Sequence, residues 1–443
     1  MLAARRLPTA AVASARVART YASAATGSAS AQVSSTKQGV RVATYDDLAS
    51  PAAGLSVVLN AGARHESSES LGYAHYLKNF AFQASNKRTP FRIAREAELQ
   101  GGLLYGDLSR ESISYRARFL REDWAYFTEV LAEVVTSPKF AHYALPEVRA
   151  HVQAESAAAL ADPQVAMMEA LHRVAFRTGL GNSLYATATS GVSADAIRHY
   201  QLANLAGLTV VGHGVEHASL VAAVERAFEG FDLAPVPTSV ATKYHGGNAH
   251  LDAPAAVASG NAICALAFSA SAADRPAARA LRYLLGGESH VKWSHGQSPL
   301  AKVAQQHGAE VRGLNLEYSD ASLVGFVTHA PAGNIRSAVH DLSAELRKVA
   351  SGDVSTEALQ RALATARFEA ADSVDSIDAR LTKIGEDVAA SGKSVSVAES
   401  IAAIAEVKSS DVVNLAKRLV KSRPSLAAAG NPHDLPYADE LGF

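Results

Sequence analysis

The chain has 443 residues, of which 48% are apolar and 19% charged, and its formal net charge is −1. This composition is typical of a globular protein and excludes long disorder, while the length suggests two or more domains of roughly 100–200 residues each. The balanced charge, without any Lys/Arg-rich run, argues against nucleic acid as a partner. No stretch approaches the roughly 18 consecutive apolar residues of a membrane-spanning helix.

The first thirty residues have the composition of a targeting segment. They include four arginines, and the first acidic residue of the whole chain is Asp46. A basic, Ser-rich and acid-free start is typical of a mitochondrial or chloroplast transit peptide. Arg19, Tyr21 and Ala22 resemble a mitochondrial cleavage pattern, so we predict a presequence over 1–21. The mature chain is then expected to begin near Ala22.

The first half of the remaining chain mixes strand and helix patterns. A flexible segment is expected over 22–37, before the first domain. Apolar spacing then predicts, in order, a strand over 55–62, a helix over 86–101, a Gly-rich turn over 101–106, a strand over 112–119, a helix over 123–135, a strand over 208–212 and a helix over 217–228.

The second half repeats this order. Gly101 and Gly106 recur 207 positions later as Gly308 and Gly313. The corresponding predictions are a strand over 262–268, a helix over 275–285, a Gly-rich turn over 306–313, a strand over 322–329, a helix over 335–349 and a strand over 425–430.

This doubled pattern predicts an α+β fold of two related domains, each a mainly antiparallel sheet packed with helices. We expect the N-terminal domain over 38–230 and the C-terminal domain over 246–443. The stretch 231–245 contains two prolines and no clear periodicity, so it is interpreted as the linker.

The only cysteine, Cys264, lies in an apolar run and is expected to be a buried hydrophobe. A single thiol forms no internal disulfide, which fits a reducing compartment. The chain also lacks the cysteine sets that bind iron–sulfur clusters or attach haem, so no cofactor is expected.

The most informative segment runs from Leu71 to Phe82. It resembles the inverted zinc-peptidase motif, His-x-x-Glu-His, of the pitrilysin-like family, in which two His bind Zn²⁺ and the Glu is the general base. Here the first ligand position holds His75, the base position Lys78 and the second ligand position Asn79. Glu155 is the best match to the ligand that this family supplies downstream.

The chemistry fails at both changed positions. The Lys78 ammonium cannot accept a proton from water, and it would place a positive charge beside the dication. The Asn79 carbonyl is a poor zinc ligand, and the two remaining ligands are fewer than the three of a catalytic site. We therefore expect no metal site, with His75, Lys78, Asn79 and Glu155 as its vestige.

The resemblance covers nearly all of the mature chain, including the segment 285–300 and the ending 429–441. The family includes the mitochondrial processing peptidase and the core proteins of the cytochrome bc1 complex. The α subunit of the peptidase carries a longer glycine-rich loop where this chain has only Gly286, Gly287 and Gly296. For 285–300 we therefore expect an ordered surface loop.

Three functions follow from this resemblance. The first is a non-catalytic core subunit of the dimeric bc1 complex, on the matrix side of the inner membrane, which contacts core protein 1 and associates with the membrane through membrane-spanning partners. The second is the non-catalytic α subunit of the processing peptidase, which binds presequences. The third is an active zinc peptidase, which Lys78 and Asn79 disfavour.

Overall fold

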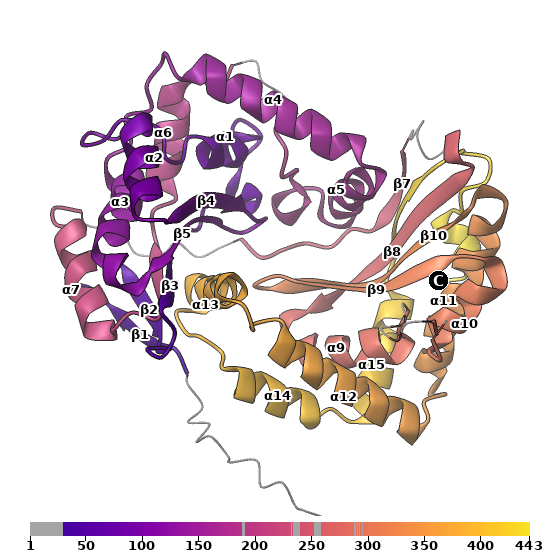
Figure 1. Ribbon diagram of the computed structural model, residues 1–443. Helices are drawn as coiled ribbons and strands as arrows, with labels where there is room; N and C mark the ends of the chain where they lie inside the picture. The colour runs from indigo at the N-terminus through magenta and orange to yellow at the C-terminus, as the bar shows by residue number, and fades with distance from the viewer. Residues whose placement is uncertain are drawn as a thin grey trace, which may run out of the picture.

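The computed structural model describes residues 30–187, 191–231, 233, 240–251, 258–287, 289, 291, 293–294 and 296–443. The predicted presequence 1–21, with Arg19, Tyr21 and Ala22, lies outside these residues, as does part of the predicted linker 231–245. Two mixed sheets, each flanked by helices, form the two halves of the molecule (Figure 1). The α+β prediction is therefore confirmed.

The first sheet has the strand order β1-β2-β6-β3-β5-β4. Only β2 and β6 pair in parallel, and the other pairs are antiparallel. The strands are β1 (Gln32–Ser35), β2 (Arg41–Tyr45), β3 (Ala52–Leu59), β4 (Leu103–Leu108), β5 (Ile113–Leu120) and β6 (Thr209–His213).

The second sheet repeats this topology in the order β7-β11-β8-β10-β9. Here β7 and β11 form the parallel pair, as β2 and β6 do in the first sheet. The strands are β7 (Gly247–Leu251), β8 (Asn261–Ser271), β9 (Glu310–Glu317), β10 (Ala321–Pro331) and β11 (Ser425–Ala429). The described part of the second sheet contains no counterpart of β1.

Helices cover both sheets, and their apolar faces form the core. In the first half they are α1 (Tyr73–Asn79), α2 (Pro90–Leu99), α3 (Trp124–Thr136), α4 (Leu145–Ala161), α5 (Pro163–Phe176), α6 (Ala194–Ala203) and α7 (His217–Ala227). In the second half they are α9 (Arg275–Leu285), α10 (Pro299–His307), α11 (Ile335–Ser351), α12 (Thr356–Asp372), α13 (Ile377–Ser391), α14 (Val397–Ala405) and α15 (Ser409–Lys421).

None of the helices in the described residues is both long enough and apolar enough to cross a bilayer. Cys264 lies in β8 and is fully buried, which confirms the expected buried hydrophobe. Burial raises the pKa of its thiol.

Three sequence predictions were wrong, and all three concern edge strands. The predicted Gly-rich turns 101–106 and 306–313 contain most of β4 and the start of β9, and residues 32–35 of the expected flexible segment form β1. An edge strand has a neighbour on one side only and is partly exposed on both faces. Its residues therefore lack the apolar alternation that marks an inner strand, and glycine is tolerated there.

Two helices are exchanged between the halves. Helix α5 of the first half packs on β7, β8 and β11 of the second sheet, with Met167 and Leu171 fully buried against Ala265 and Ala427. Helix α13 of the second half packs on β2, β3 and β6 of the first sheet, where Leu381 and Val388 bury against Val211.

Glycine allows α13 to approach the first sheet closely. A Cβ on Gly54 of β3 would lie 2.9 Å from the side chains of Ile377 and Leu381. A Cβ on Gly385 of α13 would lie 2.8 Å from Val58. Larger residues at these two positions would push the helix off the sheet.

A buried arginine joins the hairpin turns of the two halves. The Arg64 side chain is only 6% exposed, and its guanidinium donates to Glu111 at 2.6 Å and to Asp320 at 2.7 Å. Glu111 follows the β4 strand, and Asp320 lies in the turn between β9 and β10. Arg64 also donates to the carbonyl of Val240 at 3.1 Å, so the chain between the halves is held at the same point.

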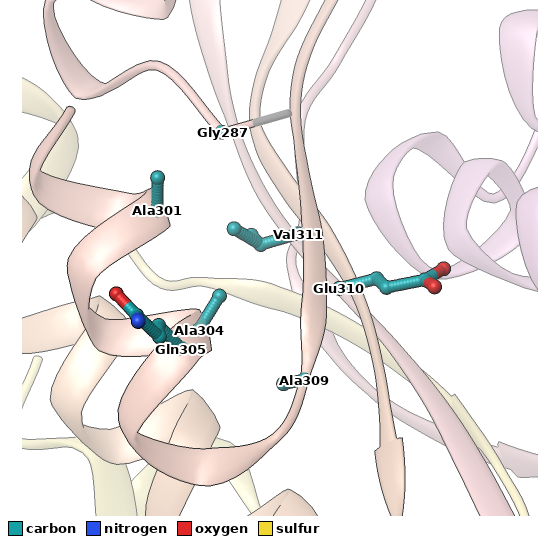
Figure 2. Close-up of a pocket in the computed structure, with 7 residues that line it drawn as sticks. All are labelled: Gly287, Ala301, Ala304, Gln305, Ala309, Glu310 and Val311. Atoms are coloured by element: carbon teal, nitrogen blue, oxygen red, sulfur yellow. The ribbon is translucent and has the colours of Figure 1, made fainter. Parts of the chain in front are cut away.

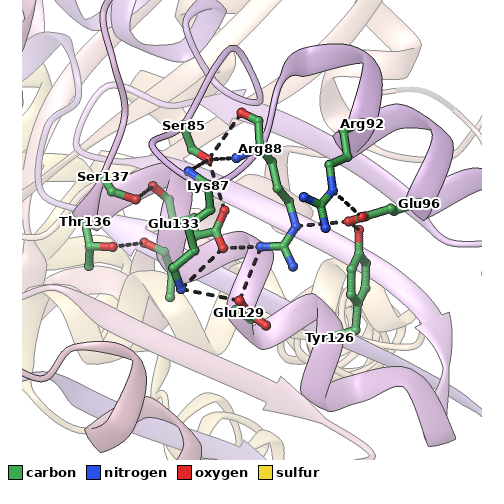
Figure 3. Close-up of polar contacts among 11 residues, drawn as sticks. Ser85, Lys87, Arg88, Arg92, Glu96, Tyr126, Glu129, Glu133, Thr136 and Ser137 are labelled. Atoms are coloured by element: carbon green, nitrogen blue, oxygen red, sulfur yellow. Dashed lines mark hydrogen bonds and ion pairs between the residues drawn. The ribbon is translucent and has the colours of Figure 1, made fainter.

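An ion-pair network fixes α2 against α3 (Figure 3). Arg88 pairs with Glu96 of α2 at 3.0 Å, with Glu129 of α3 at 3.4 Å and with Glu133 of α3. Arg92 lowers the pKa of Glu96 to about 2. Arg88 and Glu133 are almost fully buried, so the removal of either partner would take the strongest counter-charge from the other and weaken the contact between α2 and α3.

Candidate functional site

The structure brings the four motif residues together. His75, Lys78 and Asn79 lie on α1, and Glu155 lies on α4, which packs against α1. Positions 75, 78 and 79 are three and four residues apart, so they share one helical face that points at Glu155.

The carboxylate of Glu155 is the centre of the cluster. The Lys78 ammonium donates to both of its oxygens, at 3.0 and 2.8 Å. The same Oε2 atom accepts from Asn79 Nδ2 at 2.9 Å and from His75 Nε2 at 2.8 Å. Both oxygens that would bind a metal ion are therefore used by nitrogen donors.

The hydrogen bonds of His75 define its tautomer. The backbone N–H of Ala186 donates to His75 Nδ1 at 3.2 Å, so the ring proton is assigned to Nε2, which faces Glu155 at 2.8 Å. Burial lowers the pKa of His75, so the ring is neutral at pH 7. In this tautomer the Nε2 atom carries the ring proton and donates it to Glu155, so the ring holds the carboxylate in place.

Burial by itself would raise the pKa of Glu155. The hydrogen bonds from Lys78, Asn79 and His75 outweigh burial and lower this pKa to about 2. The side chain is 32% exposed, so water screens part of this interaction. A carboxylate that stays ionised to such low pH cannot act as a general acid near neutral pH.

Two further residues contribute to the cluster and were not identified from the sequence. His151 lies one turn before Glu155 on α4, with its Nε2 atom 3.5 Å from Glu155 Oε1. Glu66 is buried and accepts the backbone N–H groups of Gly72 and Ala74 at 3.0 and 2.8 Å, which anchors the start of α1. The i, i+4 spacing could have indicated His151, whereas nothing in the local sequence marks Glu66.

Zinc, which the pitrilysin-like motif implies, does not fit these residues. A catalytic zinc ion needs three protein ligands and a base for its water, and here an ammonium and an amide take two of these places. Across the part of the chain that the structure describes, no group of three or more His, Cys, Asp or Glu side chains is arranged to hold a metal ion.

The structure also has a pocket of about 280 Å³ between α10 and β9 (Figure 2). These elements belong to the second half, whereas the Glu155 cluster lies on α1 and α4 of the first half. It is lined by Gly287, Ala301, Ala304, Gln305, Ala309, Glu310 and Val311. Glu310 is the only titratable residue among them, and its carboxylate points away from the pocket (Figure 2). The lining therefore offers no pair of groups for acid–base chemistry.

The segment 285–300, expected to be an ordered surface loop, borders this pocket through Gly287. Residues 288, 290, 292 and 295 lie outside the described part. The backbone of Gly287 runs against the edge strand β9, because a Cβ there would lie 2.7 Å from the carbonyl oxygen of Val311.

The fold and the cluster together define a two-domain zinc-peptidase scaffold without catalytic residues. The insulinase family, peptidase family M16, matches residues 41–188, and the inactive domain of peptidase M16 matches residues 192–366. The boundary between the two matches, at residues 188–192, lies after α5.

Curated relatives of this chain include proteins named mitochondrial cytochrome b-c1 complex subunit 2. The protein of Cryptococcus neoformans is 37% identical over 91% of this chain and 93% of its own length. That of Neurospora crassa is 35% identical over 96% and 94%, and the human protein is 27% identical over 91% and 90%. The chain belongs to the family of cytochrome b-c1 complex subunit 2 (core protein 2), within peptidase family M16, and it is a non-catalytic member.

The low pKa of Glu155 predicts a specific pH dependence of stability. Its folded-state pKa lies below its ordinary value of 4.5, so the stabilisation is present above pH 4.5 and is lost as the pH falls toward 2. We expect Glu155→Gln to remove roughly 1–2 kcal/mol of unfolding free energy at pH 7, after allowance for solvent screening, and almost none at pH 2. Chemical denaturation across this pH range measures the effect.

The matched control is Glu229→Gln, because Glu229 is exposed and makes no ion pair with a described residue; this change should leave the pH profile unchanged. Equal losses at pH 7 and pH 2 for Glu155→Gln would contradict the assigned ion cluster.

The placement of the cluster also predicts that zinc binding can be restored. The double variant Lys78→Glu with Asn79→His supplies the missing base and the missing ligand on the same face of α1 as His75. We expect one chelator-sensitive zinc ion per chain, measured by elemental analysis after gel filtration.

Adding His75→Ala to the double variant should abolish this binding, since it removes a ligand. A folded double variant that takes up no zinc would mean that the ligand geometry has been lost along with the ligands.

Proposed function

We propose that this chain is a non-catalytic structural subunit of the cytochrome b-c1 complex, respiratory complex III, and that it supports the assembly and stability of the complex. The observation that carries the proposal is the Glu155 cluster, in which Lys78 and Asn79 replace the base and a ligand of a zinc peptidase. Proteins named as subunit 2 of this complex are similar in sequence to this chain over 91% and 96% of its length.

The finer parts of the proposal concern place and partners. The chain is peripheral on the matrix side of the mitochondrial inner membrane and is held there by membrane-spanning partners. Its nearest partner is core protein 1, within a dimeric complex. The domain division at 231–245 belongs to the same proposal. It is supported by the two repeated sheets, since β6 of the first sheet ends at His213 and β7 of the second begins at Gly247. The family models divide the chain earlier, between residues 188 and 192.

The alternative function is that of the non-catalytic α subunit of the processing peptidase. That function would be favoured by a long glycine-rich loop, and the corresponding segment has only Gly286, Gly287 and Gly296. The relatives quoted above are subunits of the b-c1 complex and give this alternative no support.

We further propose removal of the presequence before Ala22. The four arginines and the absence of acidic residues before Asp46 support import along a negative-inside membrane potential. N-terminal sequencing of the protein isolated from mitochondria should give a start near Ala22. An intact Met1 would contradict the import proposal.

Deletion of the gene separates the two functions. We expect loss of assembled complex III, seen by native electrophoresis of solubilised inner membranes, with presequence cleavage of other imported proteins unchanged. Re-expression of the Lys78→Ala variant is the control for catalysis, because a structural subunit does not need a peptidase site for assembly. Accumulation of uncleaved precursors, or detection of the protein only as a free monomer, would overturn the proposal.

A further inference from the structure

The outer edge of β7 has no strand beside it in the described residues, although the equivalent edge in the first half is occupied. There β2 pairs on its outer side with β1, antiparallel, from Ser35 opposite Arg41 to Gln32 opposite Thr44. Since β7 pairs with β11 as β2 pairs with β6, β7 corresponds to β2. The described backbone groups of 248–251 are hydrogen-bonded only to β11.

The described end of the linker, residues 240–245, does not take the position of β1. Arg41 and Gly247, the first residues of β2 and β7, are 206 positions apart, so the counterpart of β1 would include Val240. The carbonyl of Val240 instead accepts from Arg64. Thr242 is held at the same place, beside Arg64 and Asp320. It donates to the Asp320 carboxylate through its N–H at 2.8 Å and through its hydroxyl at 2.9 Å.

Basic side chains gather at the start of this edge. The backbone of His245 donates to the carbonyl of Ala175 at 2.8 Å, which places it beside the C-terminal end of α5. A Cβ on Gly247 would lie 3.7 Å from the guanidinium of Arg423, just before β11. The cationic cluster comprises Arg177 and Lys243, which both act on His245, and Arg423.

This cluster has no anionic partner in the described part of the chain. None of its three side chains makes an ion pair or a side-chain hydrogen bond with a described residue. Arg177 and Lys243 both act on His245 as like charges. Concentrated positive charge in a chain of net charge −1 favours an acidic partner at this point.

We propose that the free edge of β7 binds an extended acidic segment of another subunit, which adds to the second sheet as an antiparallel strand. This inference rests on the proposed function, because the partner is a subunit of the same complex. The strand edge supplies backbone hydrogen bonds, and the cationic cluster selects the acidic side chains. An antiparallel strand in the place of β1 has its C-terminal end at the start of β7, so its acidic residues lie at that end.

Tyr437 gives a reporter next to this edge. Its ring packs edge-on against His250 of β7 at 4.5 Å and is 40% exposed. We would replace Tyr437 with photoreactive benzoylphenylalanine, which preserves an aromatic ring, and irradiate the isolated b-c1 complex. We expect a crosslink to a peptide of another subunit with at least two acidic residues, identified by mass spectrometry.

Charge reversal tests the cationic cluster. The double variant Arg177→Glu with Lys243→Glu should reduce the crosslink yield roughly tenfold, because it turns attraction of the acidic segment into repulsion. The matched control is Arg361→Glu with Lys417→Glu, two exposed basic residues on α12 and α15, which should leave the yield unchanged. Hydrogen exchange of amides 248–251 should be slower in the complex than in the isolated chain, and the double variant should lose this protection.

The possible failures can be told apart. If the chain co-purifies with the complex but Tyr437 crosslinks only to this chain, to a second copy or to lipid, the strand proposal falls and the proposed function stands. An equal yield in the charge-reversal and control variants also overturns the proposal. If the chain is absent from the complex, the proposed function itself is wrong.

Discussion

The exchange of α5 and α13 between the two sheets is the constraint on which the rest of the structure depends. Each helix belongs to one half by sequence and buries its apolar face on the sheet of the other. A fully buried Met or Leu contributes roughly 1.5–3 kcal/mol, so Met167, Leu171 and Leu381 make separation of the halves costly. Both faces of each sheet can be covered because side chains alternate along a strand. In β3 and β8, one set of side chains packs on helices of the same half, and the other set faces the exchanged helix.

The exchanged α5 also explains why the vestigial zinc site keeps its shape. Helix α4, which carries Glu155, leads directly into α5, and α5 is held on the second sheet. The position of Glu155 is thus set by packing that does not depend on a metal ion. The Glu155 carboxylate still needs a positive charge beside it. The Lys78 ammonium supplies this charge, which a dication would supply in a peptidase.

Much of this fold could be predicted from the sequence, because inner strands and amphipathic helices leave a periodic pattern. The helix over 275–285 and the strand over 425–430 were predicted to within one residue, and the 207-residue repeat led to the two sheets. The strands that were missed are the edge strands β1, β4, β7 and β9, together with β2. These strands are short or have mixed exposure.

The exchange could not be predicted, for a different reason. Helix α5 needs an apolar face in order to be buried, but this face does not indicate which of the two similar sheets the helix covers. The candidate site shows the same division. The spacing of His75, Lys78 and Asn79 put them on one face, and the motif gave Glu155, whereas Glu66 and Ala186 reach α1 only through the tertiary fold.

Comparison of the two halves distinguishes the features that both contain from the features present in one half. The parallel pair, the antiparallel pairs and the following helices occur in both halves, so they are needed for a stable unit. Among the described residues, the Glu155 cluster and β1 occur only in the first half, and the unpaired edge of β7 with its cationic cluster occurs only in the second. A peptidase has to admit a substrate between its halves, but here Arg64 bonds both hairpin turns at once, and opening would break its pair with Asp320. Two halves that are fixed to each other, with the outer edge of β7 unpaired in the described residues, suit a protein that binds other subunits and catalyses no reaction.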